Sequence, residues 1–153
     1  IGNHLHSAHR YVSPSSRFSR KHIDFDVLAT KGTTVGCDFT GTVVALGSKV
    51  TKDYKPGDRI SGVTHGSNAS RFDSGCFGEY CIVKEGPTFK LPDSIPDEKA
   101  ATVGVAVTTV ALAFYDNLGM PYPGSGRSGN GDWVLIYGGS TATGSLAIQA
   151  AVQ

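Results

Sequence analysis

The sequence predicts an α+β fold, in which a turn-rich β domain precedes helices and one strand–loop–helix unit. Through the middle of the chain, short runs of β-branched residues alternate with turn signals about every ten residues. An apolar stretch with helix start and stop signals follows. The chain then continues through a short apolar run, a glycine turn and a second apolar helix. These three observations define the predicted order of elements.

The composition is that of a globular chain. Its 153 residues suffice for one domain, or for one domain and part of another. Hydrophobic residues make up 39% and charged residues 18%, with a formal net charge of +1. This charge gives no electrostatic reason to expect a nucleic-acid or acidic-membrane partner, and no apolar run is long enough to span a membrane. We expect a cytoplasmic protein without either partner. The 20 scattered glycines indicate many tight turns.

Residues 1–20 differ from the rest because they contain three arginines, five serines and no acid. They show neither helical nor strand periodicity. We expect a disordered or atypical tail, with a transit peptide as the alternative. A small metal cluster could be formed by His4, His6 and His9. Because no strand or helix is expected to hold these side chains in a fixed orientation, we predict no metal site. Met120 is the only methionine, which indicates a start site further upstream.

The cysteines do not suggest a disulfide framework. Cys37 is distant in sequence from Cys76 and Cys81, and no C-x-x-C occurs. Cys76 and Cys81 are five residues apart on an expected strand, which places them on opposite faces. We predict reduced thiols.

The β elements are expected in a small barrel or sandwich. A P-G-D turn at residues 56–58 precedes a short strand, and a polar loop at 64–74 follows it. The expected strands are residues 41–46, 59–63, 77–83 and 89–91, with a turn at 47–48 after the first.

Helical signals begin at Pro96, which suits a first helical turn and is followed by two acids. Gly104 divides a short helix from a longer apolar one at residues 106–117, and Gly119 is expected to cap the second. A glycine-serine linker at 124–131 follows.

The final stretch is expected to hold a phosphate. A buried strand at residues 132–137, a glycine turn and an apolar helix are in the order that anion capture requires, since the helix N-terminus presents free N–H groups. The match to G-x-G-x-x-G is imperfect because Thr141 takes the middle place, and a tight strand-to-helix turn is the alternative. The candidate cofactor-binding residues are Gly138, Gly139, Ser140, Thr141, Thr143 and Gly144.

Five motifs in order give the chain a specific resemblance. They are V-G-C-D-F-T-G-T-V-V-A-L-G, K-P-G-D-R-I, G-C-F-G-E-Y, A-A-T-V-G-V-A-V-T-T-V-A and W-V-L-I-Y-G-G-S-T-A-T-G. Together they resemble the medium-chain dehydrogenase/reductase superfamily over residues 21–153. The G-G-S-T-A-T turn is similar to that of fungal enoyl reductases that work in trans with polyketide synthases.

The resemblance implies a GroES-like substrate domain with a helical connector at residues 21–131 and the incomplete start of a Rossmann domain at 132–153. It implies an NAD(P)H-dependent oxidoreductase of the enoyl or quinone reductase type, with NADPH as cofactor and NADH not excluded. The implied substrate is a small-molecule or carrier-bound enoyl compound, and a polyketide synthase is a possible partner.

The same resemblance implies a zinc-independent enzyme. Cys37, beside Asp38, stands where zinc-dependent members have a histidine, and their four-cysteine lobe is absent. We expect Cys37 to be a packed residue and Asp38 a structural acid that holds a turn.

The catalytic residues implied by the resemblance are Lys21 and Thr109, or Thr108 if the alignment is shifted by one. A lysine can neutralise developing oxyanion charge and a threonine hydroxyl can donate to a carbonyl. The alternatives are a solvated cation for Lys21 and a back-bonded helix hydroxyl for Thr109. The remaining candidates are expected to face solvent, in the case of His22 and His65, or to pack, in the case of Tyr80 and Tyr115.

Two hypotheses follow. The first is a reductase that acts only in a fuller chain, because the glycine loop belongs to a fold of which these residues supply one βα unit. The second is a non-enzymatic GroES-like interaction module that has lost its cofactor domain.

Overall fold

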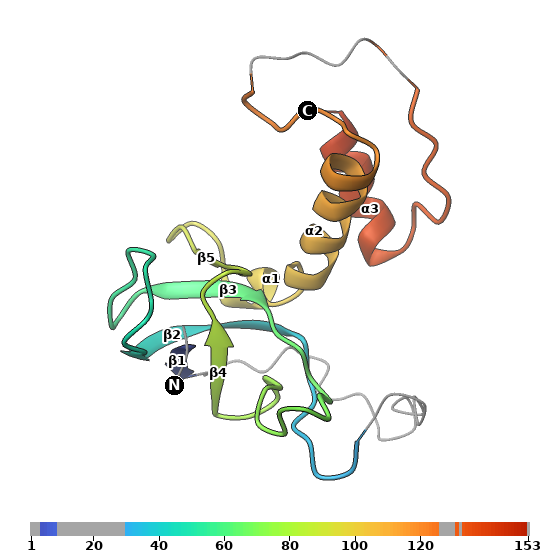
Figure 1. The fold of residues 1–153 in the computed structure, drawn as a ribbon. Coiled ribbons are helices and arrows are strands. Elements are labelled where there is room, and N and C mark those ends of the chain that lie inside the picture. Colours follow the sequence, from blue (N-terminus) through green and yellow to red (C-terminus); the bar gives the residue numbers. More distant parts are fainter. Residues whose placement is uncertain (1–3, 9–29, 126–130, 132, 153) are drawn as a thin grey trace. The chain divides into compact units, whose positions relative to one another are not determined.

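The computed structural model describes residues 4–8, 30–125, 131 and 133–152. The chain divides into two compact units, Ile1–Gly104 and Val105–Gln153, and each is described by itself (Figure 1).

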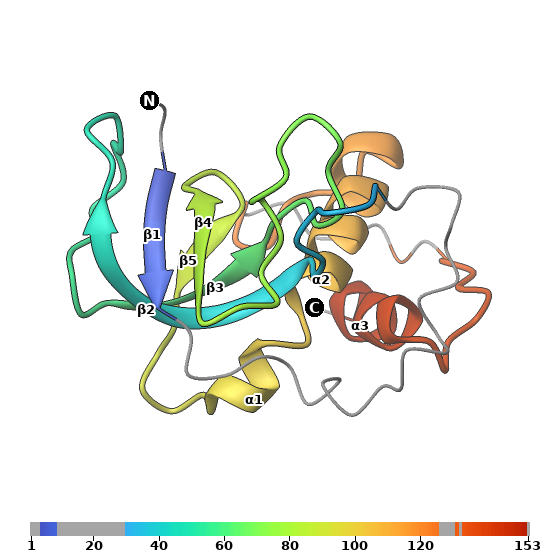
Figure 2. The same ribbon diagram turned by 90° about the horizontal axis from the view of Figure 1, so that it is seen from below.

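The first unit is built on a five-stranded antiparallel sheet with the strand order β4-β1-β2-β3-β5. The nine residues of β2 curve along the sheet (Figure 2). The strands are β1 (His4–Ala8), β2 (Asp38–Leu46), β3 (Arg59–Val63), β4 (Tyr80–Lys84) and β5 (Thr88–Lys90). The prediction of an α+β fold with a turn-rich β domain is therefore correct for this unit.

Strand β1 lies within the segment predicted to be an irregular tail, and that prediction is wrong for residues 4–8. Its backbone pairs with two strands, with Leu5 opposite Leu46 of β2 and opposite Val83 of β4. Because both neighbours are supplied by distant parts of the chain, pairing overrides the missing local periodicity. Residues 9–20 of the predicted tail, including His9, lie outside the described residues.

The predicted strands are close to the observed ones, with one informative shift. Strand β3 has the predicted bounds, β2 begins at Asp38 and β4 begins only at Tyr80. The backbone amides of Cys76 and Phe77 donate to carbonyls of residues 36 and 35, at 3.1 and 2.9 Å. These two residues therefore pair with a loop and cannot continue β4.

The core of the first unit contains both of the cysteines that were expected on opposite faces. Cys76 and Cys81 are both buried and both thiols are free. The expected opposition is wrong because Cys76 precedes the strand, where backbone alternation does not apply. Burial raises the pKa of the Cys76 thiol far above its ordinary value. The core cluster is Phe39, Val43, Tyr54, Ile60, Cys76, Cys81 and Val83.

A polar clamp joins the β2–β3 loop to the β4–β5 turn. The buried Glu85 carboxylate accepts hydrogen bonds from the Thr51 amide at 2.8 Å, the Thr51 hydroxyl at 3.1 Å and the Lys52 amide at 3.0 Å. Lys52 Nζ in turn donates to the backbone carbonyls of Glu85 at 2.8 Å and Thr88 at 3.1 Å. Because the carboxylate is buried, these partners replace the water it loses on folding.

Arg59 and Ser61 attach helix α1 (Asp97–Ala100) to the sheet. The Arg59 guanidinium binds Asp97 through both Nε, at 3.1 Å, and an Nη atom, and also donates to the Ile95 carbonyl at 2.8 Å. The buried Ser61 hydroxyl contacts the carbonyl oxygens of Phe39 and Ala100, each at 2.9 Å. Pro96 lies just before α1, as predicted, although it serves as the N-cap and not as a helical residue.

The second unit packs helices around a small apolar cluster. Helix α2 (Gly104–Ala111) continues as the π-helical segment η3 (Leu112–Asn117), and α3 (Ala142–Ala151) follows the glycine loop. The predicted stop at Gly119 is confirmed, because its φ is +66° and the Met120 amide returns to the Phe114 carbonyl at 2.9 Å. The cluster is Val110, Phe114 and Ala147, with Tyr115, Met120, Ile136, Leu146, Ala150 and Ala151 against it.

The buried strand predicted at residues 132–137 is not observed. Residues 133–136 form no strand, and the side chains of Trp133, Leu135 and Tyr137 are 94–101% exposed. A buried parallel strand needs a hydrogen-bonded neighbour on the sheet. The described part of this unit provides no such neighbour, so only Ile136 of this run packs on the cluster.

None of the helices within the described ranges combines the length and the hydropathy that crossing a lipid bilayer requires.

We expect Glu85→Ala to lower the free energy of unfolding by about 2 kcal/mol, because the amides of Thr51 and Lys52 lose their acceptor. Urea denaturation followed by circular dichroism measures the change. Glu79→Ala, at an exposed position of the same unit, is the matched control and should be close to neutral. Equal effects of the two substitutions would contradict the clamp.

The Asp58–Lys90 pair should make stability depend on pH at the acid end. A hydrogen bond from Lys90 Nζ at 3.0 Å, and then one from the Lys55 amide, hold the pKa of Asp58 below its ordinary value. A carboxyl group whose pKa is lowered in the folded state stabilises the fold at pH values above its ordinary pKa of about 4. This stabilisation disappears as the pH falls through the lower pKa of the folded state.

Asp58→Asn should therefore flatten the dependence of the urea midpoint on pH below about pH 4. Asp93→Asn, at a fully exposed side chain, is the control and should retain the slope of the parent protein. An unchanged slope in Asp58→Asn would show that the pair does not contribute.

Candidate functional site

The predicted phosphate loop forms a tight turn that leads directly into α3. Gly138 has a φ of +85°, and the Thr141 amide closes the turn on the Gly138 carbonyl at 3.0 Å. Thr141 is the N-cap of α3, since its hydroxyl oxygen accepts from the Gly144 amide at 3.0 Å. The same hydroxyl donates to the Gly138 carbonyl at 2.8 Å. The Thr141 hydroxyl proton is thus committed to the loop itself.

Gly144 allows the loop to approach the helix closely. A Cβ atom at Gly144 would lie 2.2 Å from the Gly138 carbonyl oxygen, a distance that no side chain tolerates. A Cβ at Gly139 would lie 3.0 Å from the end of Ile148, a flexible side chain. Close contact therefore requires glycine at Gly144, the position where a G-x-G-x-x-G turn has its last glycine, and the positive φ favours glycine at Gly138.

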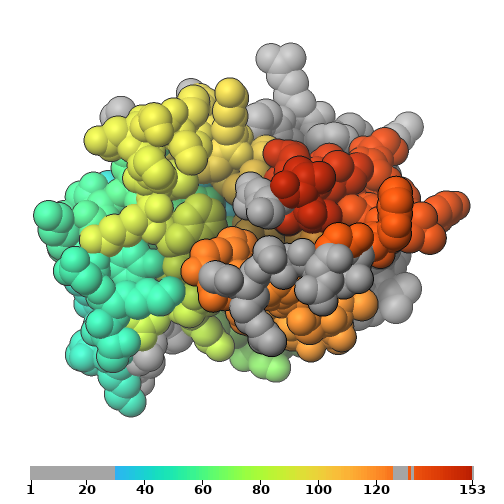
Figure 3. Space-filling view, turned by 90° about the horizontal axis from the view of Figure 1, so that it is seen from above, coloured from blue at the N-terminus to red at the C-terminus, as the bar shows by residue number. Residues whose placement is uncertain are grey.

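The geometry leaves backbone donors at the start of α3. Within the described residues, no acceptor is bonded to the amides of Gly139, Ser140, Ala142 or Thr143. These amides belong to the N-terminal turn, where the helix dipole also favours negative charge. On the surface shown in Figure 3, atoms of α3 (red) are accessible. Amides without a partner at a helix N-terminus are the kind of donor that can bind an anion, and Ser140 and Thr143 carry hydroxyl groups in the same loop and first helical turn.

Thr109 lies on α2 with an exposed side chain, and its hydroxyl donates to the Val105 carbonyl at 2.8 Å. This is the back-bonded arrangement that was the alternative to a catalytic role. Thr108 is exposed as well. Lys21 and His22 lie outside the described residues.

Two residues near the start of β2 differ in how well their predicted roles hold. Cys37 is exposed, so the prediction of a packed residue is wrong, although its carbonyl accepts a hydrogen bond from the Thr64 amide at 2.8 Å. Asp38 Oδ1 lies against the first residue of α2, only 2.9 Å from where a Cβ of Gly104 would be. Asp38 is the first residue of β2, and its role in holding a turn stays a prediction.

The prediction that Tyr80 and Tyr115 pack against other residues holds for only one of the two tyrosines. Tyr115 packs in the second unit and stacks on Tyr122, with ring centroids 4.6 Å apart, as expected. Tyr80 is 64% exposed at the start of β4, so the expectation that it packs is wrong. The first residue of a short edge strand leaves its outward side chain uncovered.

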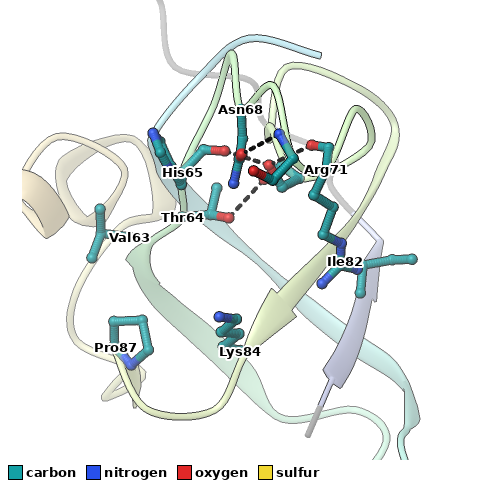
Figure 4. Close-up of a pocket in the computed structure, with 10 residues that line it drawn as sticks. Val63, Thr64, His65, Asn68, Arg71, Ile82, Lys84 and Pro87 are labelled. Carbon is teal, nitrogen blue, oxygen red and sulfur yellow. Dashed lines mark hydrogen bonds between the residues drawn. The ribbon is translucent and has the colours of Figure 1, made fainter. Parts of the chain in front are cut away.

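A cavity of about 650 Å³ in the first unit was not predicted from the sequence. Figure 4 shows its residues on the loop after β3, on β4 and on the β4–β5 turn. His65, expected to face solvent, is exposed but also lines this cavity. The only advance signal was the polar composition of residues 64–74. The lining residues are Val63, Thr64, His65, Asn68, Ser70, Arg71, Ser74, Ile82, Lys84 and Pro87.

Within the described ranges, no group of three or more His, Cys, Asp or Glu side chains is arranged to hold a metal ion.

The alcohol dehydrogenase GroES-like domain family matches residues 16–93, about half of the chain. The chain therefore belongs to this family. One curated protein to which the chain is similar is the trans-enoyl reductase TOXD of Cochliobolus carbonum. The two are 42% identical over 124 residues, which is 81% of this chain and 41% of TOXD.

Solved structures show the same fold. A putative zinc-dependent alcohol dehydrogenase protein from Rhizobium etli is 26% identical, with a TM-score of 0.65 over 99% of this chain and 41% of that protein. The mycobacterial protein Rv1454c, solved in complex with NADPH, is 21% identical and has a TM-score of 0.62. The match covers 98% of this chain and 42% of the Rv1454c chain. The chain thus spans about two fifths of the proteins that it matches.

We expect Thr141→Ala to destabilise the start of α3 by about 1 kcal/mol, because the Gly144 amide loses its cap. Amide hydrogen exchange of α3, measured by NMR, should show lower protection. Thr141→Ser retains the hydroxyl and is the control. Equal protection in both variants would contradict the capping role.

Proposed function

We propose that this chain is part of an NADPH-dependent, zinc-independent enoyl reductase of the medium-chain dehydrogenase/reductase superfamily. The observation that carries the proposal is the loop from Gly138 to Gly144, where four amides at the N-terminus of α3 have no acceptor among the described residues. The similarity to a trans-enoyl reductase supports an enoyl substrate. The GroES-like family match supports the superfamily.

In this proposal, residues 21–131 form the substrate domain with its connector, and residues 132–153 begin a Rossmann cofactor domain. The exposed apolar run at Trp133, Leu135 and Tyr137 is what an inner strand of such a domain would present before its neighbours are added. NADPH, when bound, supplies the hydride. The amides of Gly139, Ser140, Ala142 and Thr143 would hold its phosphate groups, and NADH is the competing cofactor.

The chain's own residues would orient the substrate and manage its charge. Lys21 would neutralise the negative charge that develops on the carbonyl oxygen of a 2-enoyl thioester. Thr109 would give up its bond to the Val105 carbonyl and donate to the substrate or to the cofactor carboxamide. The substrate is either a free small molecule or carried by a polyketide synthase, which is the proposed partner.

Nicotinamide fluorescence tests the cofactor assignment. NADPH should bind at micromolar concentration to the protein extended through the rest of its cofactor domain, and NADH more weakly. A folded, extended protein that binds neither cofactor, or that fails to consume NADPH with a 2-enoyl thioester, would overturn the proposed function.

Thr109→Val should lower kcat about tenfold, the effect of losing one useful hydrogen bond, and leave the fold intact. Thr102→Val is a matched control, since Thr102 is also exposed and its hydroxyl also bonds a backbone carbonyl, that of Lys99 at 2.8 Å. Steady-state NADPH consumption gives both values. If the two variants behave alike, Thr109 has no catalytic role.

A further inference from the structure

The cavity of the first unit combines basic side chains with an aliphatic wall. Lys84, Arg71 and His65 line it, and none of its lining residues is acidic. Val63, Ile82 and Pro87 supply the apolar surface. Lys84 enters from β4, on the opposite side from the loop that carries Asn68 and Arg71 (Figure 4). The volume of about 650 Å³ is in the range of small-ligand sites.

The loop wall of the cavity is held by its own hydrogen bonds. The Thr64 hydroxyl donates to the Ser74 carbonyl at 2.7 Å, and the Ser74 hydroxyl donates to the Arg71 carbonyl at 3.0 Å. The amide of Arg71 donates to the Asn68 carbonyl at 3.1 Å. Further along, the Ser67 amide bonds the Thr34 carbonyl at 2.9 Å. A wall fixed in this way needs little reorganisation to bind a ligand.

Several donors at the cavity remain available. Within the described residues, neither Lys84 Nζ nor the Ser70 hydroxyl has a hydrogen-bond partner. Asn68 accepts from the Ser70 amide through Oδ1 at 2.9 Å, which leaves its Nδ2 group to donate. Arg71 Nε is paired with Asp73 at 3.1 Å, which fixes the guanidinium and offsets part of its charge. Ammonium, amide and hydroxyl donors on facing walls suit an oxyanion with several oxygens.

We propose that this cavity binds the phosphate-bearing arm of a carrier-bound substrate. A phosphate alone would leave most of the volume unused, whereas an elongated arm can place its phosphate at Lys84, Asn68 and Ser70 and its chain along Val63, Ile82 and Pro87. The choice of arm rests on the proposed function, in which the enoyl group is a thioester. The proposed function involves a second ligand with phosphate groups, the nucleotide cofactor, and the experiment must distinguish it from the substrate arm.

Calorimetric titration at low ionic strength with 4′-phosphopantetheine and with pantetheine tests the site. The full chain should bind the phosphorylated compound about tenfold more tightly, since a charge-assisted contact is lost without the phosphate. Lys84→Gln should remove that difference and Ser70→Ala should reduce it. Lys49→Gln, at an exposed turn away from the cavity, is the matched charge control and should retain it.

Equal binding of the two compounds, or equal effects of Lys84→Gln and Lys49→Gln, would overturn the inference. If Lys84→Gln instead weakens NADPH binding, the phosphate recognised is that of the cofactor, and the assignment to the substrate arm fails. Circular dichroism verifies that each variant is folded.

Turnover by the extended protein separates this inference from the proposed function. A lower KM for a phosphopantetheine thioester than for the pantetheine thioester, a difference that Lys84→Gln abolishes and Lys49→Gln retains, supports the site. Equal KM values with normal turnover refute the site alone. Phosphopantetheine binding without any turnover of either thioester refutes the proposed function alone.

Discussion

Direct contact of backbone on backbone at Gly62 is the constraint on which the first unit depends. A Cβ at Gly62 would lie 2.2 Å from the Pro87 carbonyl oxygen, and a Cβ at Gly104 would lie 2.2 Å from the Gly62 carbonyl oxygen. Strand β3 is therefore packed between the β4–β5 turn and the first residue of α2. The Val63 amide bonds the Pro87 carbonyl at 3.1 Å, so the same contact also fixes one wall of the cavity.

The two candidate sites use different kinds of donor. The glycine loop offers backbone amides, whose direction is set by the turn at Gly138 and by the cap at Thr141. The cavity offers the side chains of Asn68 and Ser70 on a hydrogen-bonded loop and that of Lys84 on β4. Backbone donors cannot be tuned by substitution without moving the chain, whereas side-chain donors can. The donors of the cavity can therefore be changed by substitution while the fold remains.

The sequence located the candidate loop but assigned one of its residues incompletely. Thr141 was expected to donate to a phosphate, and in the structure its hydroxyl caps α3 and closes the loop. The S-T-A-T pattern is compatible with both roles, because a hydroxyl beside a helix N-terminus can bond either the backbone or a ligand. The cavity had no local pattern at all. Lys84 and Asn68 line one cavity only when β4 packs beside the loop after β3.

What the sequence determined by itself was set by local chemistry. The bounds of β3, the start of α1 after Pro96, the stop at Gly119 and the turn before α3 follow from residues whose backbone preferences act over a few positions. The tertiary structure decided the features that depend on residues distant in the sequence. Strand β1 forms because β2 and β4 leave room for it, whereas the apolar run at residues 133–137 stays out of any sheet because the described part of its unit brings no neighbouring strand to it. A strand is defined by its hydrogen-bonded neighbours, and these cannot be read from its own residues.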